Sequence, residues 1–158
     1  MVLICIVITM QVILLGGYDL AYQLVQNFKL PSSKVYGAAV SDFARGKQMP
    51  KILDLLKQIK AVIIDQDFDA IVLAAMEVFV KEQKDKKSAE KLLGYLINPR
   101  GIVLGNRLCG KYKTAYMTAA RDSLVDEIRI IYQECKDVDP KTADFCKRFI
   151  DGYQSAKN

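Results

Sequence analysis

One stretch of the chain, from Lys111 to Lys136, keeps a single hydrophobic period for longer than any other part. Its apolar residues recur at steps of three and four, as they do in a helix that buries one side. These residues are Tyr112, Tyr116, Ala119, Ala120, Leu124, Ile128, Ile131 and Cys135. The stretch contains no Pro and no Gly. The pattern predicts one long helix over about residues 112–136, roughly 36 Å in length, against which shorter helices pack.

The remainder of the chain after Asp19 is divided by Pro and Gly into shorter segments with helical periodicity. Pro31 ends one such segment, and Pro140 follows the capping residue Asp139 at the start of the last one. Residues 100–110 contain three glycines and are interpreted as a connector with room for one helical turn. The sequence therefore predicts an all-α, single compact domain of about six or seven helices, with no internal repeat.

The first fifteen residues are apolar apart from Thr9 and Gln11, and two glycines follow them. Position, length and small residues at the end favour a secretory signal peptide over residues 1–17, which leaves residues 18–158 as the mature, extracellular domain. The absence of Lys and Arg from the segment argues against that interpretation. A membrane anchor requires about 20 apolar residues, so no transmembrane span is expected in the mature chain. The third alternative is a buried β-strand, because many of these residues are β-branched.

Cysteine placement gives one candidate disulfide. Cys109 and Cys135 fall at opposite ends of the predicted long helix, which is too far apart for a bond. Cys135 lies in the last turn of that helix and Cys146 lies two turns into the next one, so a short loop can bring them together. In a secreted chain this pair is predicted to form a disulfide. The alternative is that both are buried free thiols.

Several catalytic chemistries are excluded by composition. The chain has no His, which removes Ser-His-Asp and Cys-His catalysis and the usual zinc sites. The string from Gly105 to Lys111 resembles a phosphate-binding loop, but Tyr112 occupies the position where Ser or Thr holds Mg²⁺. The aspartates of residues 65–69 lack the Gly and Glu that complete a calcium loop. We therefore expect no enzymatic activity, no cofactor and no metal.

The favoured function is the binding of a hydrophobic or amphipathic small molecule or lipid. A secreted helical domain rich in aliphatic residues and Met can enclose a helix-lined cavity. The candidate lining residues are Met76, Phe79, Tyr95, Tyr112 and Tyr116. The alternative is that these side chains form an ordinary filled core.

A second function rests on charge. The formal net charge is +5, and residues 91–121 carry six basic side chains and no acidic one. These are Lys91, Arg100, Arg107, Lys111, Lys113 and Arg121. Such a stretch favours a secreted interaction protein of the venom, saliva, effector or reproductive-fluid type that engages an anionic partner. The stretch has no recognisable nucleic-acid-binding motif, and a solvated surface with a local charge excess is the simpler alternative.

Overall fold

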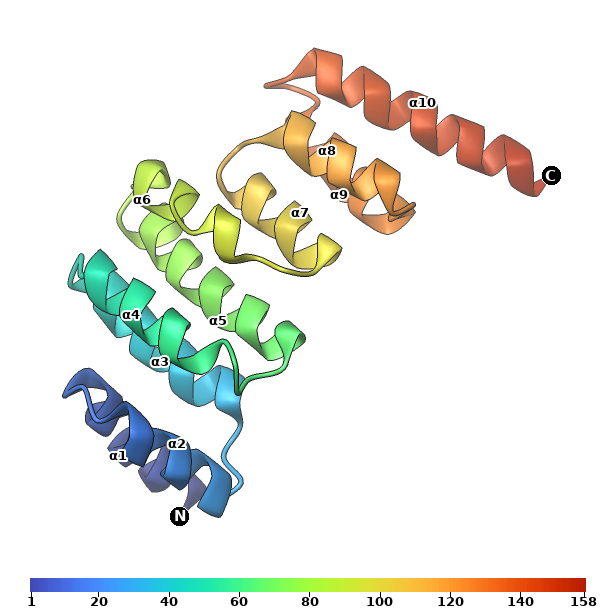
Figure 1. The fold of residues 1–158 in the computed structure, drawn as a ribbon. Coiled ribbons are helices and arrows are strands. Elements are labelled where there is room, and N and C mark those ends of the chain that lie inside the picture. Colours follow the sequence, from blue (N-terminus) through green and yellow to red (C-terminus); the bar gives the residue numbers. More distant parts are fainter. The chain divides into compact units, whose positions relative to one another are not determined.

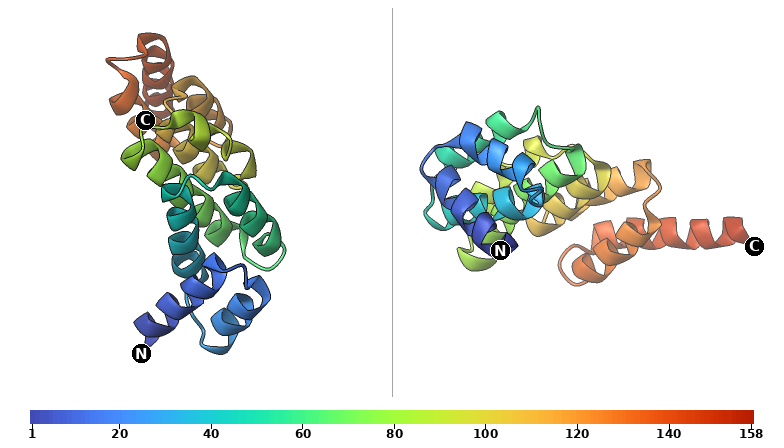
Figure 2. Two further views of the ribbon diagram at one scale, coloured as in Figure 1. Left: turned by 90° about the vertical axis from the view of Figure 1, so that its left-hand side faces the viewer. Right: turned by 90° about the horizontal axis from the view of Figure 1, so that it is seen from below.

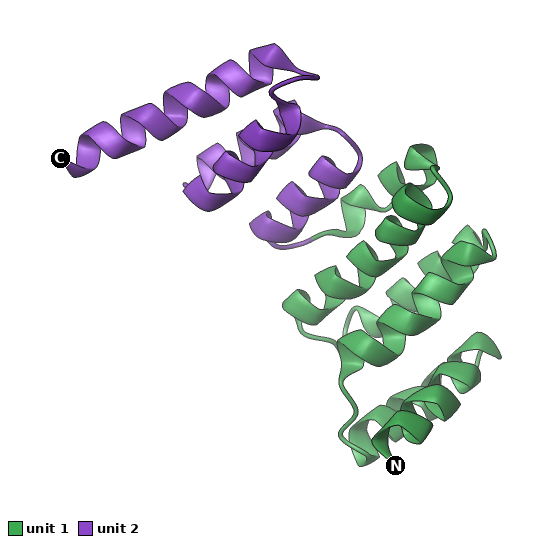
Figure 3. Ribbon diagram, turned by 180° about the vertical axis from the view of Figure 1, so that it is seen from behind, with its two compact units in different colours: residues 1–96 green, residues 97–158 purple.

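The computed structural model describes residues 1–158, which form ten α-helices and no strand (Figure 1). The chain divides into two compact units, residues 1–96 and residues 97–158 (Figure 3). The all-α class predicted from the sequence is confirmed. The predicted number of six or seven helices is too low. The segments expected to be a connector and one long helix form three separate helices, and the N-terminal segment, left out of the predicted domain, forms a further helix.

Unit 1, residues 1–96, consists of successive helical hairpins. Its helices are α1 (Val2–Leu14), α2 (Tyr18–Asn27), α3 (Ser32–Arg45), α4 (Met49–Ile59), α5 (Asp65–Glu77) and α6 (Lys86–Glu90). A π-helical segment, η1 (Val78–Glu82), continues α5, and a short 3₁₀ segment, η2 (Leu93–Tyr95), follows α6. The first helices of the three hairpins lie side by side, with α1 against α3 and α3 against α5 (Figures 1 and 2).

The core of unit 1 lies mainly between α3 and α5. Its large, fully buried side chains include Tyr36, Phe43, Phe68, Ile71 and Met76. Burial of each aliphatic or aromatic side chain of this size contributes about 1.5 to 3 kcal/mol to folding. A Cβ placed on Gly37 would lie 3.8 Å from the Cβ of Ala74. Small residues therefore let the two helices approach closely at the centre of the unit.

Five helices, α1, α2, α3, α7 and α8, end in the same type of turn. In each, the second residue after the helix has a positive φ; these residues are Gly16, Lys29, Lys47, Gly110 and Ser123. After α3, the N–H of Lys47 donates to the carbonyl of Ala44 at 2.9 Å and that of Gln48 to Phe43 at 2.8 Å. This pair of bonds is the Schellman motif, which satisfies free carbonyls at a helix end and reverses the chain. The repeated motif explains why consecutive helices form hairpins.

Unit 2, residues 97–158, contains four helices. They are α7 (Pro99–Leu108), α8 (Tyr112–Arg121), α9 (Val125–Cys135) and α10 (Pro140–Lys157). The predicted connector over residues 100–110 is wrong, because these residues form most of α7. Gly101 and Gly105 are four residues apart and both buried, so they lie on one packed face of that helix. The sequence pattern suggested that Gly101 and Gly105 break the helix, whereas in the structure they permit close packing.

The predicted long helix over residues 112–136 is also wrong. The chain reverses at Asp122–Leu124, where Ser123 has a φ of +54°. The reversal folds α9 back against α8, so Ala119 and Ile128 share one core. A stripe with steps of three and four persists through the turn, because the apolar sides of both helices face that core. The predicted cap of α10 is confirmed: the Asp139 carboxylate accepts hydrogen bonds from the N–H and hydroxyl of Thr142.

The apolar N-terminal segment forms α1, so the β-strand alternative is wrong. Thr9 and Ile13 of α1 are buried, and the helix packs against α2 and α3. Cleavage after Gly17 is a separate matter and stays a prediction. No helix of the chain combines the length and the apolar character that a bilayer-spanning segment requires.

Candidate interaction surfaces

The residues predicted to line a lipid cavity do not come together in one. Met76 and Phe79 are buried among the core side chains of unit 1. Tyr95 instead lines an open groove of about 410 Å³ on the surface of unit 1, beside Leu53 and Lys57. The remaining two tyrosines belong to the other unit. The five side chains therefore occupy three separate environments.

Tyr112 and Tyr116 support the core of unit 2. Both are partly buried and pack against the residues shared by α8, α9 and α10. The Tyr116 ring stacks on Phe145 with 5.9 Å between centroids and meets Phe149 edge-on at 6.5 Å. Burial raises the pKa of both tyrosines. This geometry is that of an aromatic cluster that joins α8 to α10.

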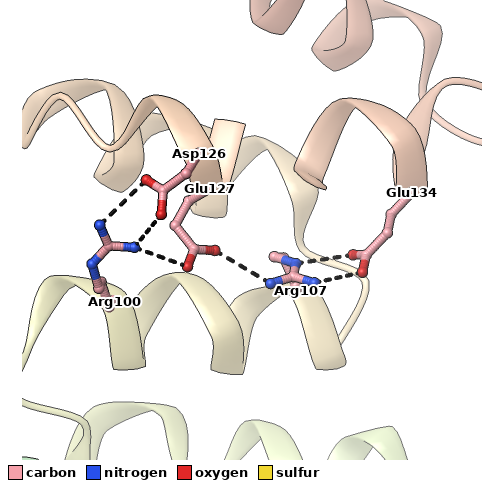
Figure 4. A network of polar contacts seen from close by, with 5 residues as sticks. All are labelled: Arg100, Arg107, Asp126, Glu127 and Glu134. Carbon is pink, nitrogen blue, oxygen red and sulfur yellow. Dashed lines mark hydrogen bonds and ion pairs between the residues drawn. The ribbon is translucent and has the colours of Figure 1, made fainter. Parts of the chain in front are cut away.

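Two of the six predicted basic-patch residues, Arg100 and Arg107, bind carboxylates of α9. Arg100 and Arg107 project from α7 toward α9, and Glu127 lies between them (Figure 4). Arg100 is 2.7 Å from Asp126 and 3.3 Å from Glu127. Arg107 is 3.3 Å from Glu127 and 2.6 Å from Glu134. We refer to these five residues as the α7–α9 ion-pair network.

The centre of the α7–α9 ion-pair network is shielded from solvent. The side chains of Arg107 and Glu127 are each only 14% exposed. The hydrogen bond from Arg100 lowers the pKa of the Asp126 carboxyl, and the bond to Glu134 raises the pKa of the Arg107 guanidinium. The network ties α7 to α9.

The other basic residues of the stretch are dispersed. Arg121 pairs with Asp122 at 3.0 Å, whereas Lys91, Lys111 and Lys113 are exposed. Lys91 belongs to unit 1 and the other residues to unit 2. The count of charges over residues 91–121 omitted the acidic residues of α9, which follow that stretch in the chain. The structure thus does not support a basic surface that engages an anionic partner.

A surface groove in unit 1 between α2 and α4 is lined by three tyrosines, and we call it the tyrosine groove. It has a volume of about 400 Å³. Its lining residues are Tyr18, Asp19, Tyr22, Gln23, Tyr36, Gln58, Ile59 and Val62. Sequence analysis missed the groove, because its residues come from three helices and the turn after α4, and the packing of these elements was unknown.

Electrostatics within the tyrosine groove differ from one tyrosine to the next. Tyr18 hydrogen-bonds the Asp54 carboxylate, and burial followed by the charge of Asp54 raises its pKa. Tyr36 is buried at the base, and desolvation together with the nearby Tyr22 raises its pKa to about 12. Its hydroxyl has no hydrogen-bond partner. The polar tips and apolar faces of the three tyrosine rings suit contacts with a protein surface.

A smaller groove of about 200 Å³ lies between α3 and α5–η1, next to a charged clamp. Arg45, at the end of α3, makes two hydrogen bonds to Glu82, of 3.0 and 3.1 Å. The Gln83 amide donates to the carbonyls of Ala44 and Arg45 at 2.8 and 3.1 Å. These contacts satisfy the end of α3 and fix η1 beside it.

The predicted disulfide between Cys135 and Cys146 is absent, and all four cysteines are free thiols. The two residues are buried on facing sides of α9 and α10, where their thiols interact with each other. Burial is the main cause that raises the pKa of both, that of Cys146 to about 12. The proximity of the pair was foreseen, but the thiols remain protonated and unbonded.

The hairpin arrangement has a regular spacing. Helices α3, α5 and α7 begin at Ser32, Asp65 and Pro99, so their starts are roughly 34 residues apart, the length of a tetratricopeptide (TPR) repeat. A family model described as "ZFYVE26-like, TPR repeats" matches residues 31–151. The chain belongs to the ZFYVE26-like TPR repeat family. The expectation that the chain has no internal repeat is therefore wrong.

A curated relative supports the membership of this ZFYVE26-like chain. Protein DDB_G0276689 of Dictyostelium discoideum is 34% identical to it over 121 residues, which cover 77% of the chain. The chain spans only 4% of the length of that relative. No solved structure matches the chain.

Family membership corrects the functional predictions. A secreted lipid carrier requires a closed apolar cavity, whereas TPR hairpins stack in an open array whose surface faces solvent. The prediction of a secreted lipid carrier is therefore wrong, as is that of a disulfide-bonded chain. The same holds for the secreted protein that engages an anionic partner. The extracellular localisation itself stays a prediction. The repeat period is a feature that sequence analysis could have used, had the helix starts been placed correctly.

Proposed function

We propose that the chain is a non-enzymatic, protein-binding repeat segment and that its principal contact surface is the tyrosine groove. Family membership supports binding of proteins, since stacked helical hairpins provide extended surfaces for partners. The observation that carries the choice of surface is the convergence of three tyrosines on one groove of about 400 Å³.

The composition of the tyrosine groove fits a protein partner. Tyr is enriched in protein interfaces, because it supplies a large contact area and a polar tip at low entropic cost. Tyr22 and Val62, which both line the groove, are 36% and 46% exposed. Exposed apolar area flanked by Asp19, Gln23 and Gln58 gives an apolar centre with a polar rim.

Site-specific photocrosslinking tests the proposal. A benzophenone amino acid at Gln58, in the tyrosine groove, should give discrete adducts with one or a few proteins in cells that express the chain naturally. The same amino acid at Arg129, exposed on α9, serves as the matched control. Combining the Gln58 probe with Tyr22→Ala should reduce the adducts about tenfold or more, as expected for an interface hot spot. Equal adducts at both positions, or adducts insensitive to Tyr22→Ala, would count against this surface.

A further inference from the structure

The tyrosine groove carries acidic charge and no basic side chain. It lies between the first two hairpins of unit 1, so both of its walls belong to the chain. Asp19 is the one charged residue that lines it, and the exposed carboxylate of Asp54 accepts a hydrogen bond from Tyr18 beside it. Neither carboxylate belongs to an ion pair. The formal net charge of the chain is +5, so the groove has the opposite sign and favours a cationic occupant.

The three tyrosine rings of the groove have no cation of their own. The cation–π contacts of the chain lie elsewhere, with Lys51 over Phe43 and Lys157 over Tyr153. The face of an aromatic ring attracts a cation, and in proteins that cation is more often arginine than lysine. Tyr22 is 36% exposed, so its ring is accessible to a cation from another molecule.

The groove also presents acceptors of hydrogen bonds. The exposed amides of Gln23 and Gln58 lie on its two walls. At its base the buried hydroxyl of Tyr36 makes no hydrogen bond. A buried polar group without a partner is costly, so a donor that reaches this hydroxyl gains a bond and breaks none in the protein. Tyr22 lies near the hydroxyl, and a shift of its half-exposed side chain would open the hydroxyl to an occupant.

An arginine side chain matches all three features. Its guanidinium is planar, always charged and weakly hydrated, it stacks on aromatic rings, and it has five N–H donors for several acceptors at once. A lysine ammonium is a strongly hydrated point charge with three donors, so it matches them less well. We infer that the tyrosine groove binds an arginine side chain of the partner protein through Asp19 and Tyr22. This inference rests on the proposed protein-binding role of the groove.

An NMR titration of the isotope-labelled chain of 158 residues tests the inference. The probe is the acetylated and amidated peptide Gly-Gly-Arg-Gly-Gly. Matched peptides replace its arginine with citrulline, which has a similar shape but no charge, or with lysine. The arginine peptide should shift the side-chain amide signals of Gln23 and Gln58 with a dissociation constant of about 1 mM, as expected for one side chain. The citrulline peptide should bind at least about tenfold more weakly, and the lysine peptide about threefold more weakly.

Substitutions in the chain separate the groove from the rest of the surface. Asp19→Asn and Asp137→Asn each remove one exposed carboxylate, and only the first lies in the groove. Asp19→Asn should weaken binding of the arginine peptide about fivefold, whereas Asp137→Asn should leave it unchanged. Tyr36→Phe should weaken binding about threefold without lowering the urea midpoint of unfolding, a combination that a purely structural role of the hydroxyl does not produce.

The outcomes distinguish the inference from the proposed function. Equal affinity for the arginine and citrulline peptides would overturn the inference, and so would equal affinity for the arginine and lysine peptides or equal loss in the two asparagine variants. Photocrosslinking at Gln58 supplies the second readout. Adducts that depend on Tyr22, combined with no preference for arginine, would refute the inference and leave the proposed function standing. Absence of both would refute both.

Discussion

Ser123, in the reversal between α8 and α9, distinguishes the observed hairpin from the long helix that the sequence pattern predicts. Its φ is +54°, and its N–H donates to Ala120 at 3.2 Å while that of Leu124 donates to Ala119 at 2.8 Å. A residue with a Cβ is strained in this left-handed region, whereas Gly is not. We therefore predict that Ser123→Gly stabilises the protein.

The expected gain is the difference of two effects. Relief of the left-handed conformation is worth about 1 to 2 kcal/mol. The greater freedom of Gly in the unfolded chain costs about 0.4 to 1 kcal/mol. The free energy of unfolding should rise by about 0.5 to 1 kcal/mol. In a continuous helix the sign would be opposite, because Gly in a helix interior is about 0.5 kcal/mol less favourable than Ser.

Urea unfolding followed by circular dichroism at 222 nm measures this difference. For a slope of about 1 to 3 kcal/mol per molar, Ser123→Gly should raise the midpoint by a few tenths molar. Met117→Gly, at an exposed position inside α8, is the control and should lower the free energy of unfolding by about 1 kcal/mol. Destabilisation by both substitutions would refute the hairpin and restore the continuous helix.

Three further predictions follow from the described contacts. Glu127→Gln should lower the free energy of unfolding by about 1 to 3 kcal/mol in urea titrations, because it removes the shielded negative charge between two arginines and turns an NH2 donor toward one of them. Asp126→Asn, at a mostly exposed position, should have a clearly smaller effect. Tyr36→Phe should be neutral or stabilising by up to about 1 kcal/mol in the same assay, since the lost hydroxyl has no partner. The pKa of Cys146 is raised to about 12, so the stability that its buried thiol contributes should be complete below about pH 9 and decline as pH rises from there toward about 12; Cys146→Ala should weaken that decline in thermal melts at pH 8 to 11.

The sequence was sufficient for the helical class and for many helix boundaries, because those depend on local chemistry. Pro140 and the capping carboxylate of Asp139 start α10 where the sequence places it. Pro50 lies in the first turn of α4, as its position before an apolar stripe indicates. Such features involve residues a few positions apart, so one sequence contains the whole interaction.

The interaction surfaces could not be predicted in this way, because their members are distant in the chain. Arg107 lies two turns into the same helix as Arg100, but its carboxylate partner Glu134 comes 27 residues later. Without the packing of α7 on α9, the two arginines appear as free positive charge. The tyrosine groove likewise joins Tyr22 of α2 to Gln58 of α4. Tertiary packing, not composition, decides which of these side chains face a partner.

The repeat could not be recognised in the sequence, because several of its turns lack the usual Gly. A Schellman turn is recognised in a sequence by Gly at the left-handed position, and Gly16 and Gly110 provide that mark. The turns after α2, α3 and α8 use Lys29, Lys47 and Ser123 instead. At α8 the apolar period also continues, because both helices of the α8–α9 hairpin direct their stripes into one core. A turn without Gly inside an unbroken apolar stripe leaves the hydrophobic pattern of a single helix unchanged. At residue 123 the hairpin differs from a continuous helix by the positive φ of Ser123. The sign of the change in stability for Ser123→Gly is therefore a direct measure of the feature that the sequence pattern could not show.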